Sequence, residues 1–251
     1  VLITTGLVKQ GRVDAAVTMG STGAAMAAAA VILGVIEGVE RPALGGPIVG
    51  LAPRTEVLDL GSNVDCRPAQ LLSFAVIGHV LARSLWGIEN PRVALLSVGM
   101  ESGKGNKLVQ ETAKLLLKSG LNFVGNVEPN DLPQGVVEVA VCDGFVGNVV
   151  MKLTEGLGSA MVDHLRKTLA DKLSETDLET LAADVYEVNN VSETWGGGPL
   201  LGVNGVSVVG HGSAKAGSVR RAIETARRFV QAGFVDGLNE ELVQVRHRMG
   251  G

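Results

Sequence analysis

Several short segments combine glycine with residues that can hold an anion, and each follows an apolar run of strand length. The first of them lies where a strand is expected to end and a helix to begin, and it consists of Gly20, Ser21, Thr22 and Gly23. Glycines beside small hydroxyls let backbone N–H groups converge on an anion at a helix N-terminus, which would make this turn a phosphate cradle. Strand-to-helix turns also need glycine for backbone reasons alone, so both interpretations stay open.

A second segment, residues 99–106, holds Lys104 between two glycines and ends with Gly105 and Asn106 at the expected start of a helix. A lysine in that position can reach an anion at the helix N-terminus. The P-loop spacing is not met, because Gly105 stands where Ser or Thr is required, so nucleotide hydrolysis is disfavoured. A solvated lysine is the alternative, but the flanking glycines favour a functional loop.

A third segment ends one strand and begins a long helix. It brings four candidate residues to the edge of the sheet: Asp143, Gly144, Gly147 and Asn148. Cys142 precedes them and suggests a nucleophile, but no helix-adjacent histidine or basic pair stands near it to lower the pKa of its thiol. We therefore interpret Cys142 as a small core residue, the commoner role of free cysteine.

Two further turns carry polar side chains that can reach a cleft. Asn63 and Asp65 follow a short strand, although turn formation alone would explain an amide and a carboxylate there. Near the end of the chain a glycine-rich loop leads to a strand and then to another helix, and we expect a second anion site in this region. Its candidate residues are Asn204, Gly205, His211, Gly212 and Ser213. The histidine can donate to a phosphate or to a leaving thiolate, or it can be a turn residue bonded to the backbone.

Composition excludes several classes of protein. The formal net charge of -4 comes from intermixed signs without a basic cluster, which argues against nucleic acid as a partner. The two cysteines fit neither a disulfide framework nor a zinc-ligand spacing, as suits a reducing cytosol. The uncharged run at residues 24–36 is shorter than the roughly 20 residues that span a bilayer, so it predicts a buried helix.

Apolar runs of strand length alternate with stretches of helical period, the pattern of parallel strands joined by crossover helices. The expected strands are residues 13–18, 47–51, 57–60, 92–98, 122–124, 136–142 and 206–209. The expected helices are residues 22–33, 68–86, 106–118, 147–173, 177–188, 215–232 and 239–247. In such folds ligands bind beyond the carboxyl ends of the strands, so we expect the candidate turns to share one rim of the sheet.

The longest expected helix carries apolar residues every four positions: Val149, Leu153, Leu157, Met161, Leu165 and Leu169. With the next helix, which Ser174 can cap, it predicts a helical hairpin over about residues 158–192. Stripes of this kind usually face a core, and we favour that interpretation. The alternative is that the hairpin projects and meets a partner subunit or a membrane.

Seven strings resemble, in this order, the bacterial phosphate acyltransferase (PlsX) family: MGSTGAAMAAA, LDLGSNVDCRP, GKGNKLVQE, NFVGNVE, VCDGFVGNVVMK, GGGPLLGVNG and VVGHGSAKA. The resemblance spans residues 14–234, and CDGFVGNV and GPLLGVNG are long, uncommon strings. Two departures stand out. Family members begin with an earlier strand and glycine loop, so we expect the chain to be N-terminally incomplete, and they usually carry Asn where this sequence has Ser21.

The resemblance implies an enzyme that converts acyl-[acyl-carrier-protein] and inorganic phosphate into acyl phosphate and free carrier protein, in phospholipid biosynthesis. It implies a three-layer αβα sandwich with a mostly parallel sheet, isocitrate/isopropylmalate dehydrogenase-like, with residues 1–251 forming one domain. It also implies a cytoplasmic homodimer with peripheral contact at the inner face of the cell membrane and a downstream glycerol-3-phosphate acyltransferase. No metal or other cofactor is expected.

Phosphate is already an anionic nucleophile and a thioester is an activated acyl donor, so positioning and charge stabilisation suffice for the reaction. We hypothesise that Lys104 and the amides of residues 20–23 hold phosphate, while Asn148 binds the developing oxyanion. A nicotinamide-dependent dehydrogenase would need an aspartate metal set and an arginine cluster that the sequence lacks. A phosphotransacetylase acting on coenzyme A thioesters and a noncatalytic acyl-carrier or phosphate-binding module remain the alternatives.

Overall fold

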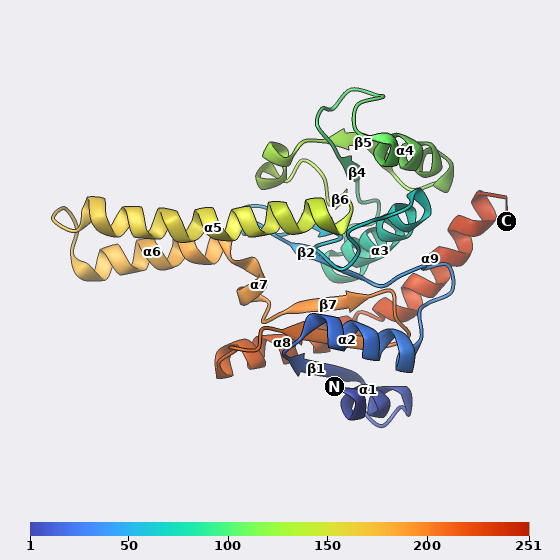
Figure 1. The fold of residues 1–251 in the computed structure, drawn as a ribbon, viewed down its shortest axis with the longest axis horizontal. Helices are drawn as coiled ribbons and strands as arrows, with labels where there is room; N and C mark the ends of the chain where they lie inside the picture. The colour runs from blue at the N-terminus through green and yellow to red at the C-terminus, as the bar shows by residue number, and fades with distance from the viewer. Residues whose placement is uncertain (251) are drawn as a thin grey trace.

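The computed structural model describes residues 1–250, and in them one eight-stranded sheet has the order β1-β8-β7-β2-β3-β6-β4-β5 (Figure 1). The strands are β1 (Ala15–Met19), β2 (Ala43–Pro47), β3 (Glu56–Leu58), β4 (Val93–Leu96), β5 (Phe123–Val127), β6 (Val139–Val141), β7 (Gly198–Leu201) and β8 (Val206–Gly210). An α/β fold is therefore confirmed. The expected strand at residues 47–51 is wrong, because β2 lies earlier and the following residues form turns.

The sheet is mixed, so the prediction of a mostly parallel sheet needs correction. β3, β6, β4 and β5 run parallel to one another, and β1 runs parallel to β8. Between these groups, β7 is antiparallel to β8, β2 is antiparallel to β7, and β3 is antiparallel to β2. The carboxyl ends of β1, β8 and β2 therefore lie at one end of the sheet, and those of β3, β6, β4 and β5 lie at the other.

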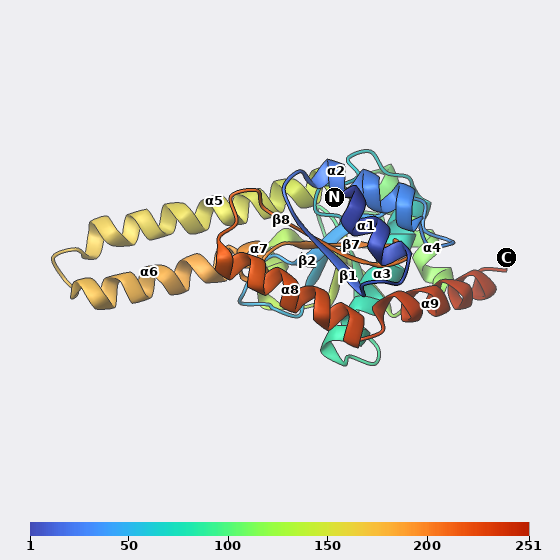
Figure 2. The same ribbon diagram turned by 90° about the horizontal axis from the view of Figure 1, so that it is seen from below.

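Helices cover both faces of the sheet (Figure 2). One layer consists of α3 (Pro68–Trp86), α4 (Lys107–Ser119), α8 (Ala216–Gln231) and α9 (Phe234–Arg248). The other contains α1 (Leu2–Lys9), α2 (Thr22–Ala28) with the π-helical turn Ala29–Leu33 that continues it, and the base of α5 (Gly144–Leu169). Strand residues alternate between the layers: Val93 and Leu95 pack towards α3, whereas Ala94 and Leu96 pack towards α5.

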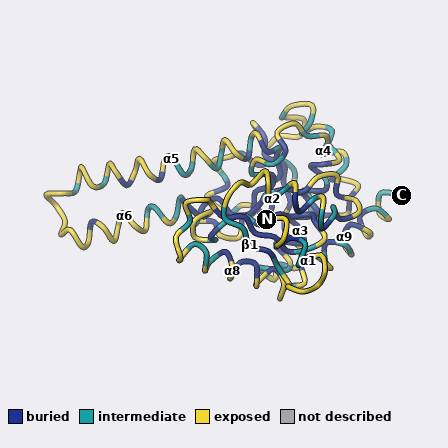
Figure 3. The backbone as a smooth tube through the Cα atoms, turned by 60° about the horizontal axis from the view of Figure 1, so that its bottom comes forward, coloured by how far each residue is buried: buried dark blue, intermediate teal, exposed yellow. Residues whose placement is uncertain are grey.

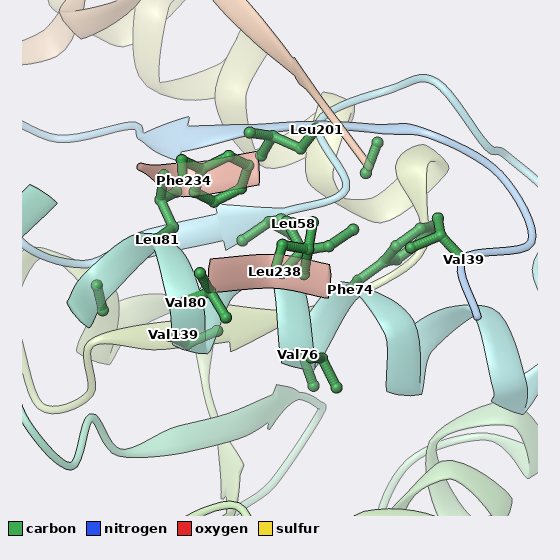
Figure 4. Close-up of a cluster of buried hydrophobic side chains, with 14 of the residues drawn as sticks. Val39, Leu58, Phe74, Val76, Val80, Leu81, Val139, Leu201, Phe234 and Leu238 are labelled. Atoms are coloured by element: carbon green, nitrogen blue, oxygen red, sulfur yellow. The ribbon is translucent and has the colours of Figure 1, made fainter. Parts of the chain in front are cut away.

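The central helix α3 shows how sequence sets one element and its packing. Pro68 occupies its first turn, where the missing N–H costs nothing, and Gly87 ends it in the left-handed conformation. Phe74 and Leu81 are fully buried in the cluster shown in Figure 4. By length and composition α3 could span a membrane, but 67% of its apolar stretch is buried in the fold, so it is a core helix.

Two strands near the middle of the sheet contain glycine where β-formers are usual. β2 reads ALGGP and β7 reads GPLL, and β7 lies where a glycine-rich loop was expected. The close approach of neighbouring strands requires this composition, since a Cβ at Gly45 would lie 2.6 Å from Leu58 Cγ. Gly45 therefore leaves room for the Leu58 side chain of the neighbouring strand β3.

The predicted helical hairpin is formed by α5 and α6 (Glu175–Asn189), and it projects far beyond the sheet before α7 (Val191–Thr194) leads back (Figures 1 and 3). Ser174 caps α6 by accepting from Asp177 N at 3.1 Å. The expectation that the α5 stripe faces the core is wrong: Val149, Leu153, Leu157 and Met161 are 48–60% exposed. The stripe lies outside because α6 packs against a different face of α5.

Candidate functional site

A cavity of ≈ 870 Å³ opens at the end of the sheet where β1, β8 and β2 finish and β7 begins. Its lining comes from the turn before α2, from β2, from one side of α5, from α7 and from the first turns of α8. Of the residues predicted from sequence, four line it: Gly20, Thr22, His211 and Ser213. This volume falls within the range of small-molecule binding sites.

Two of the predicted glycine turns meet in this cavity because their strands are neighbours. β1 pairs with β8 so that Met19 lies opposite Gly210, and Gly20 N donates to Gly210 O at 3.1 Å. Ser21 caps α2 by accepting from Ala24 N at 3.4 Å, which leaves the amides of this turn at the mouth of the helix. The predicted cradle of residues 20–23 and the predicted His211 segment thus form a single surface.

The start of α8 forms the cationic side of the cavity. Within this turn the His211 ring Nδ1 and Ser213 Oγ lie 2.6 Å apart, and Gly212 stands between the two residues. Lys215 is the N-cap residue of α8, and its side chain makes no capping bond. Ser218 N donates to Lys215 O at 2.9 Å, so the first-turn amides that can meet an anion are those of Ala216 and Gly217. Arg221, further along α8, donates to Glu193 O at 2.9 Å and lines the same cavity.

Lys215 and Arg221 were missed by sequence reasoning. A signal for Lys215 was present, because it stands two residues after a Gly-Ser pair at a helix start, much as Lys104 follows glycine at another. Arg221 gave no such signal, because it is one of several arginines on an amphipathic helix and only the fold turns it towards the cavity.

The outer rim of the cavity is tied by a polar contact between α5 and α7. Lys152 and Glu155 form an ion pair at 2.7 Å, and Glu155 also accepts from Ser192 Oγ at 2.9 Å. Both side chains line the cavity. Because the carboxylate is occupied by these two partners, it fixes the base of the hairpin relative to the start of β7.

A buried carboxyl lies behind this region. Trp195 lines the cavity and contacts Trp86 in a tilted arrangement, with 6.1 Å between ring centroids and 56° between ring planes. The indole N–H of Trp86 donates to Glu56 Oε1 at 2.6 Å. Glu56 is completely buried, and its other oxygen has no hydrogen-bond partner among the described residues. Burial raises the pKa of Glu56 to about 7, so the carboxyl holds a proton up to neutral pH.

Asn63, Asp143 and Asn148 lie at the opposite end of the sheet, beyond β3 and β6. Asn63 is buried, and its amide donates to Asp59 Oδ2 at 2.9 Å and to Pro42 O at 2.9 Å, which is the turn-forming role considered above. Asp143 caps α5 by accepting from Val146 N at 2.8 Å.

Around them, close packing explains the glycines of α5. A Cβ at Gly144 would lie 2.8 Å from Asn63 O, and one at Gly147 would collide with Asp59 O. Asn148 is exposed and lies beside Gly61, and Asp65 is exposed on the loop before α3. None of these residues lines the cavity.

The Lys104 loop lies between β4 and α4 at this same far end. Lys104 is exposed, Asn106 caps α4 by accepting from Val109 N at 3.0 Å, and Gln110 ties down the loop through the carbonyls of Gly103 and Gly105. The expectation of one shared rim is therefore wrong, because the two parallel groups of strands run in opposite directions. Catalytic roles for Lys104 and Asn148 stay predictions.

The turn between β7 and β8 contains Asn204 and Gly205. Asn204 donates from its backbone to Gly34 O at 3.0 Å and from its side chain to Val35 O at 3.2 Å. Gly205 packs close to Val8, because a Cβ at Gly205 would lie 3.1 Å from Val8 Cγ1. These contacts hold the end of the π-helical turn against the sheet, away from the cavity lining.

Cys142 is the core residue that its sequence context indicated. It is 5% exposed, packs in the cluster under α5, and burial raises the pKa of its thiol. Cys66 is half-buried and burial raises the pKa of its thiol to about 11. Both are therefore neutral thiols at physiological pH, which is the state of an unreactive cysteine.

The fold is that of the phosphotransacetylases. The chain is similar to the crystal structure of a phosphotransacetylase from Streptococcus pyogenes, with a TM-score of 0.59 and 17% identity over 92% of this chain and 66% of that one. It is also similar to the EutD phosphotransacetylase from Staphylococcus aureus, with a TM-score of 0.57, 17% identity and the same coverage of both chains. The chain thus spans about two thirds of the length of these structures.

Sequence comparison is more specific. The family model described as "Fatty acid synthesis protein" matches residues 1–236. The phosphate acyltransferase of Elusimicrobium minutum is 42% identical over 98% of this chain and 73% of its own length, and that of Pelotomaculum thermopropionicum is 43% identical with the same two coverages. The chain belongs to the phosphate acyltransferase family, whose members are enzymes that transfer an acyl group to phosphate.

Proposed function

We propose that the cavity transfers a fatty acyl group from the thioester of acyl carrier protein to inorganic phosphate, giving acyl phosphate for phospholipid synthesis. One observation carries this proposal: a single cavity has cationic side chains, Lys215 and Arg221, at the start of α8 and an apolar wall beside them. A phosphate and an alkyl chain need those two environments side by side. Acyl carrier protein and phosphate are then the two substrates.

The chemistry needs little beyond placement. An oxygen of the hydrogen phosphate dianion attacks the thioester carbonyl carbon, the carbon–sulfur bond breaks, and the phosphate proton passes to the departing thiolate. The amides at Thr22 and at the start of α8, with Lys215, offset the charge of phosphate and of the tetrahedral oxyanion. His211, held 2.6 Å from Ser213 Oγ, stands at the cavity wall where it can relay that proton.

We further infer a cytoplasmic homodimer in which the exposed stripe of α5 meets a second copy. Four apolar side chains between 48% and 60% exposed on one helix face support this, since such a stripe is rarely left uncovered. The tip of the hairpin would then contact the inner face of the membrane and bring acyl phosphate to a glycerol-3-phosphate acyltransferase. We also propose that the fold is related to that of the isocitrate and isopropylmalate dehydrogenases.

The test is an assay of acyl phosphate, trapped by hydroxylamine as hydroxamate. We expect phosphate-dependent product from palmitoyl-[acyl-carrier-protein]. A parallel reaction with palmitoyl-coenzyme A separates this activity from that of a phosphotransacetylase, which would prefer the coenzyme thioester. Absence of phosphate-dependent product from both donors would refute the proposal, and binding of the carrier thioester without turnover would indicate a noncatalytic module.

A further inference from the structure

The wall of the cavity opposite α8 is apolar and belongs to the protein core. Ile48, Leu60 and Met151 line the cavity, and they also pack together in the buried cluster beneath α5. Ile48 is 6% exposed, whereas Leu60 and Met151 are half-buried with one side facing the open space. The cavity therefore ends on side chains that are already held in place by the fold.

The apolar wall exists because the core on this face of the sheet is interrupted. The face under α3 and α8 carries one continuous cluster, but the opposite face carries two, one beneath α5 and one beneath α2. Gly45 and Gly46 of β2 line the cavity and contribute no side chains to it. A trough therefore runs over β2, bounded by Leu44 of the α2 cluster and by Met151 of the α5 cluster.

The trough is continuous with the cationic end of the same cavity. A thioester whose carbonyl lies beside phosphate near Lys215 must send its alkyl chain away from the charged helix start, since buried charges are poor neighbours for methylenes. Ile48, Leu60 and Met151 form an apolar stretch of the lining, and the neighbouring cation, Lys152, is paired with Glu155 at 2.7 Å.

We propose that the trough over Gly46, lined by Ile48, Leu60 and Met151, holds the acyl chain of the thioester and that Met151 determines the chain length accepted. This inference rests on the proposed function and adds a specificity-determining residue to it. Methionine suits the position, because its flexible thioether fills an irregular apolar gap without a polar demand. Met151 reaches the trough from the base of α5, so a helix and not a loop sets its position.

The experiment compares Met151→Ala, which lengthens the trough, with Met151→Trp, which shortens it. For each protein kcat/KM is measured with octanoyl- and palmitoyl-[acyl-carrier-protein], together with the KM for phosphate. Each methylene that an apolar site gains or loses changes kcat/KM by about fourfold. We expect the palmitoyl-to-octanoyl ratio to fall about tenfold or more for Met151→Trp and to rise for Met151→Ala, with the KM for phosphate unchanged.

Met26→Ala is the matched control, because Met26 packs in the neighbouring cluster beneath α2 and does not line the cavity. Its palmitoyl-to-octanoyl ratio should equal that of the unsubstituted chain. Leu60→Ala supplies a second enlargement of the trough if Met151→Trp does not fold. Equal losses with both chain lengths, or an unchanged ratio in every variant, overturn the inference while the proposed function stands. An unsubstituted chain that makes no acyl phosphate from either donor overturns both.

Discussion

Gly147, in the first turn of α5, packs directly on the backbone oxygen of Asp59 at the end of β3, and no side chain fits between them. A Cβ there would collide with that oxygen and lie 3.2 Å from Cys142 Sγ. We expect Gly147→Ala to lower the free energy of unfolding by about 1–3 kcal/mol through overpacking of backbone that cannot move aside. Urea denaturation followed by circular dichroism measures the change.

Gly156 provides the control for this substitution on the same helix. A Cβ at Gly156 would meet nothing within 4 Å. We expect Gly156→Ala to raise the free energy of unfolding by up to about 1 kcal/mol, because alanine loses less backbone entropy in a helix. Equal destabilisation by both substitutions would show that helix propensity, and not the contact with Asp59, makes glycine necessary in α5.

The buried Glu56 predicts a pH dependence of stability. Burial raises its pKa from 4.5 in a solvated carboxyl to about 7 in the folded chain, so the unfolded chain releases a proton over a range where the folded chain keeps it. The stability that this neutral group contributes is fully present below pH 4.5 and is lost as pH rises to 7, a change of about 3 kcal/mol.

Glu56→Gln isolates that contribution, since the amide oxygen can still accept from the indole of Trp86. Urea unfolding at pH 5 and at pH 7.5 should show the difference in stability between this variant and the unsubstituted chain growing with pH, in favour of the variant. A difference that stays constant over this range would mean that Glu56 is ionised in the folded chain.

The two lysines at helix starts differ in what they are expected to do. Lys215 lines the cavity and Lys104 lies beyond β4 at the other end of the sheet. Loss of a hydrogen bond to a charged group costs about 1.5–3 kcal/mol, so Lys215→Ala should raise the KM for phosphate at least about tenfold. Lys104→Ala should change it less. A larger rise in the KM for phosphate with Lys104→Ala than with Lys215→Ala would support the role predicted for Lys104 from sequence. It would also show that phosphate does not bind in the cavity.

The exposed stripe of α5 predicts an effect on assembly. Leu157→Glu places a charge in the centre of the stripe, and Ser159→Glu places the same charge on another exposed face of the helix. We expect sedimentation velocity to show dissociation of the homodimer for Leu157→Glu only, because an unpaired charge in an apolar interface is costly. A stripe that meets lipid instead would leave the dimer intact and reduce flotation with anionic liposomes.

Elements with strong local signals could be predicted closely. The expected helix at residues 68–86 coincides with α3, because Pro68 and Gly87 mark its ends and its apolar residues fill the interior. The turn before α2 and the His211 segment were both placed after strands, as the structure has them. These features depend on a few neighbouring residues, which the sequence displays directly.

The direction of the strands could not be predicted from the sequence. The prediction that the candidate residues share one rim of the sheet was wrong for that reason. β2 and β7 reverse the sheet, yet their glycines and prolines are typical of loops. Which strands pair is decided by contacts between distant segments, such as Gly45 under Leu58. Arg221 was missed for the same reason, since the side of α8 that faces the cavity follows from how the helix packs on β8 and β1.

The pairing of β1 with β8 has a consequence for biogenesis. These strands are far apart in the sequence, and each supplies one of the glycine turns that meet at Gly20 and Gly210. During synthesis the turn at Gly20 must wait for its partner until the chain has been made as far as Gly210. Closing so long a loop is slow, and β1 meanwhile exposes an unpaired edge. The surface shared by the two glycine turns therefore forms only after both β1 and β8 have been synthesised and paired.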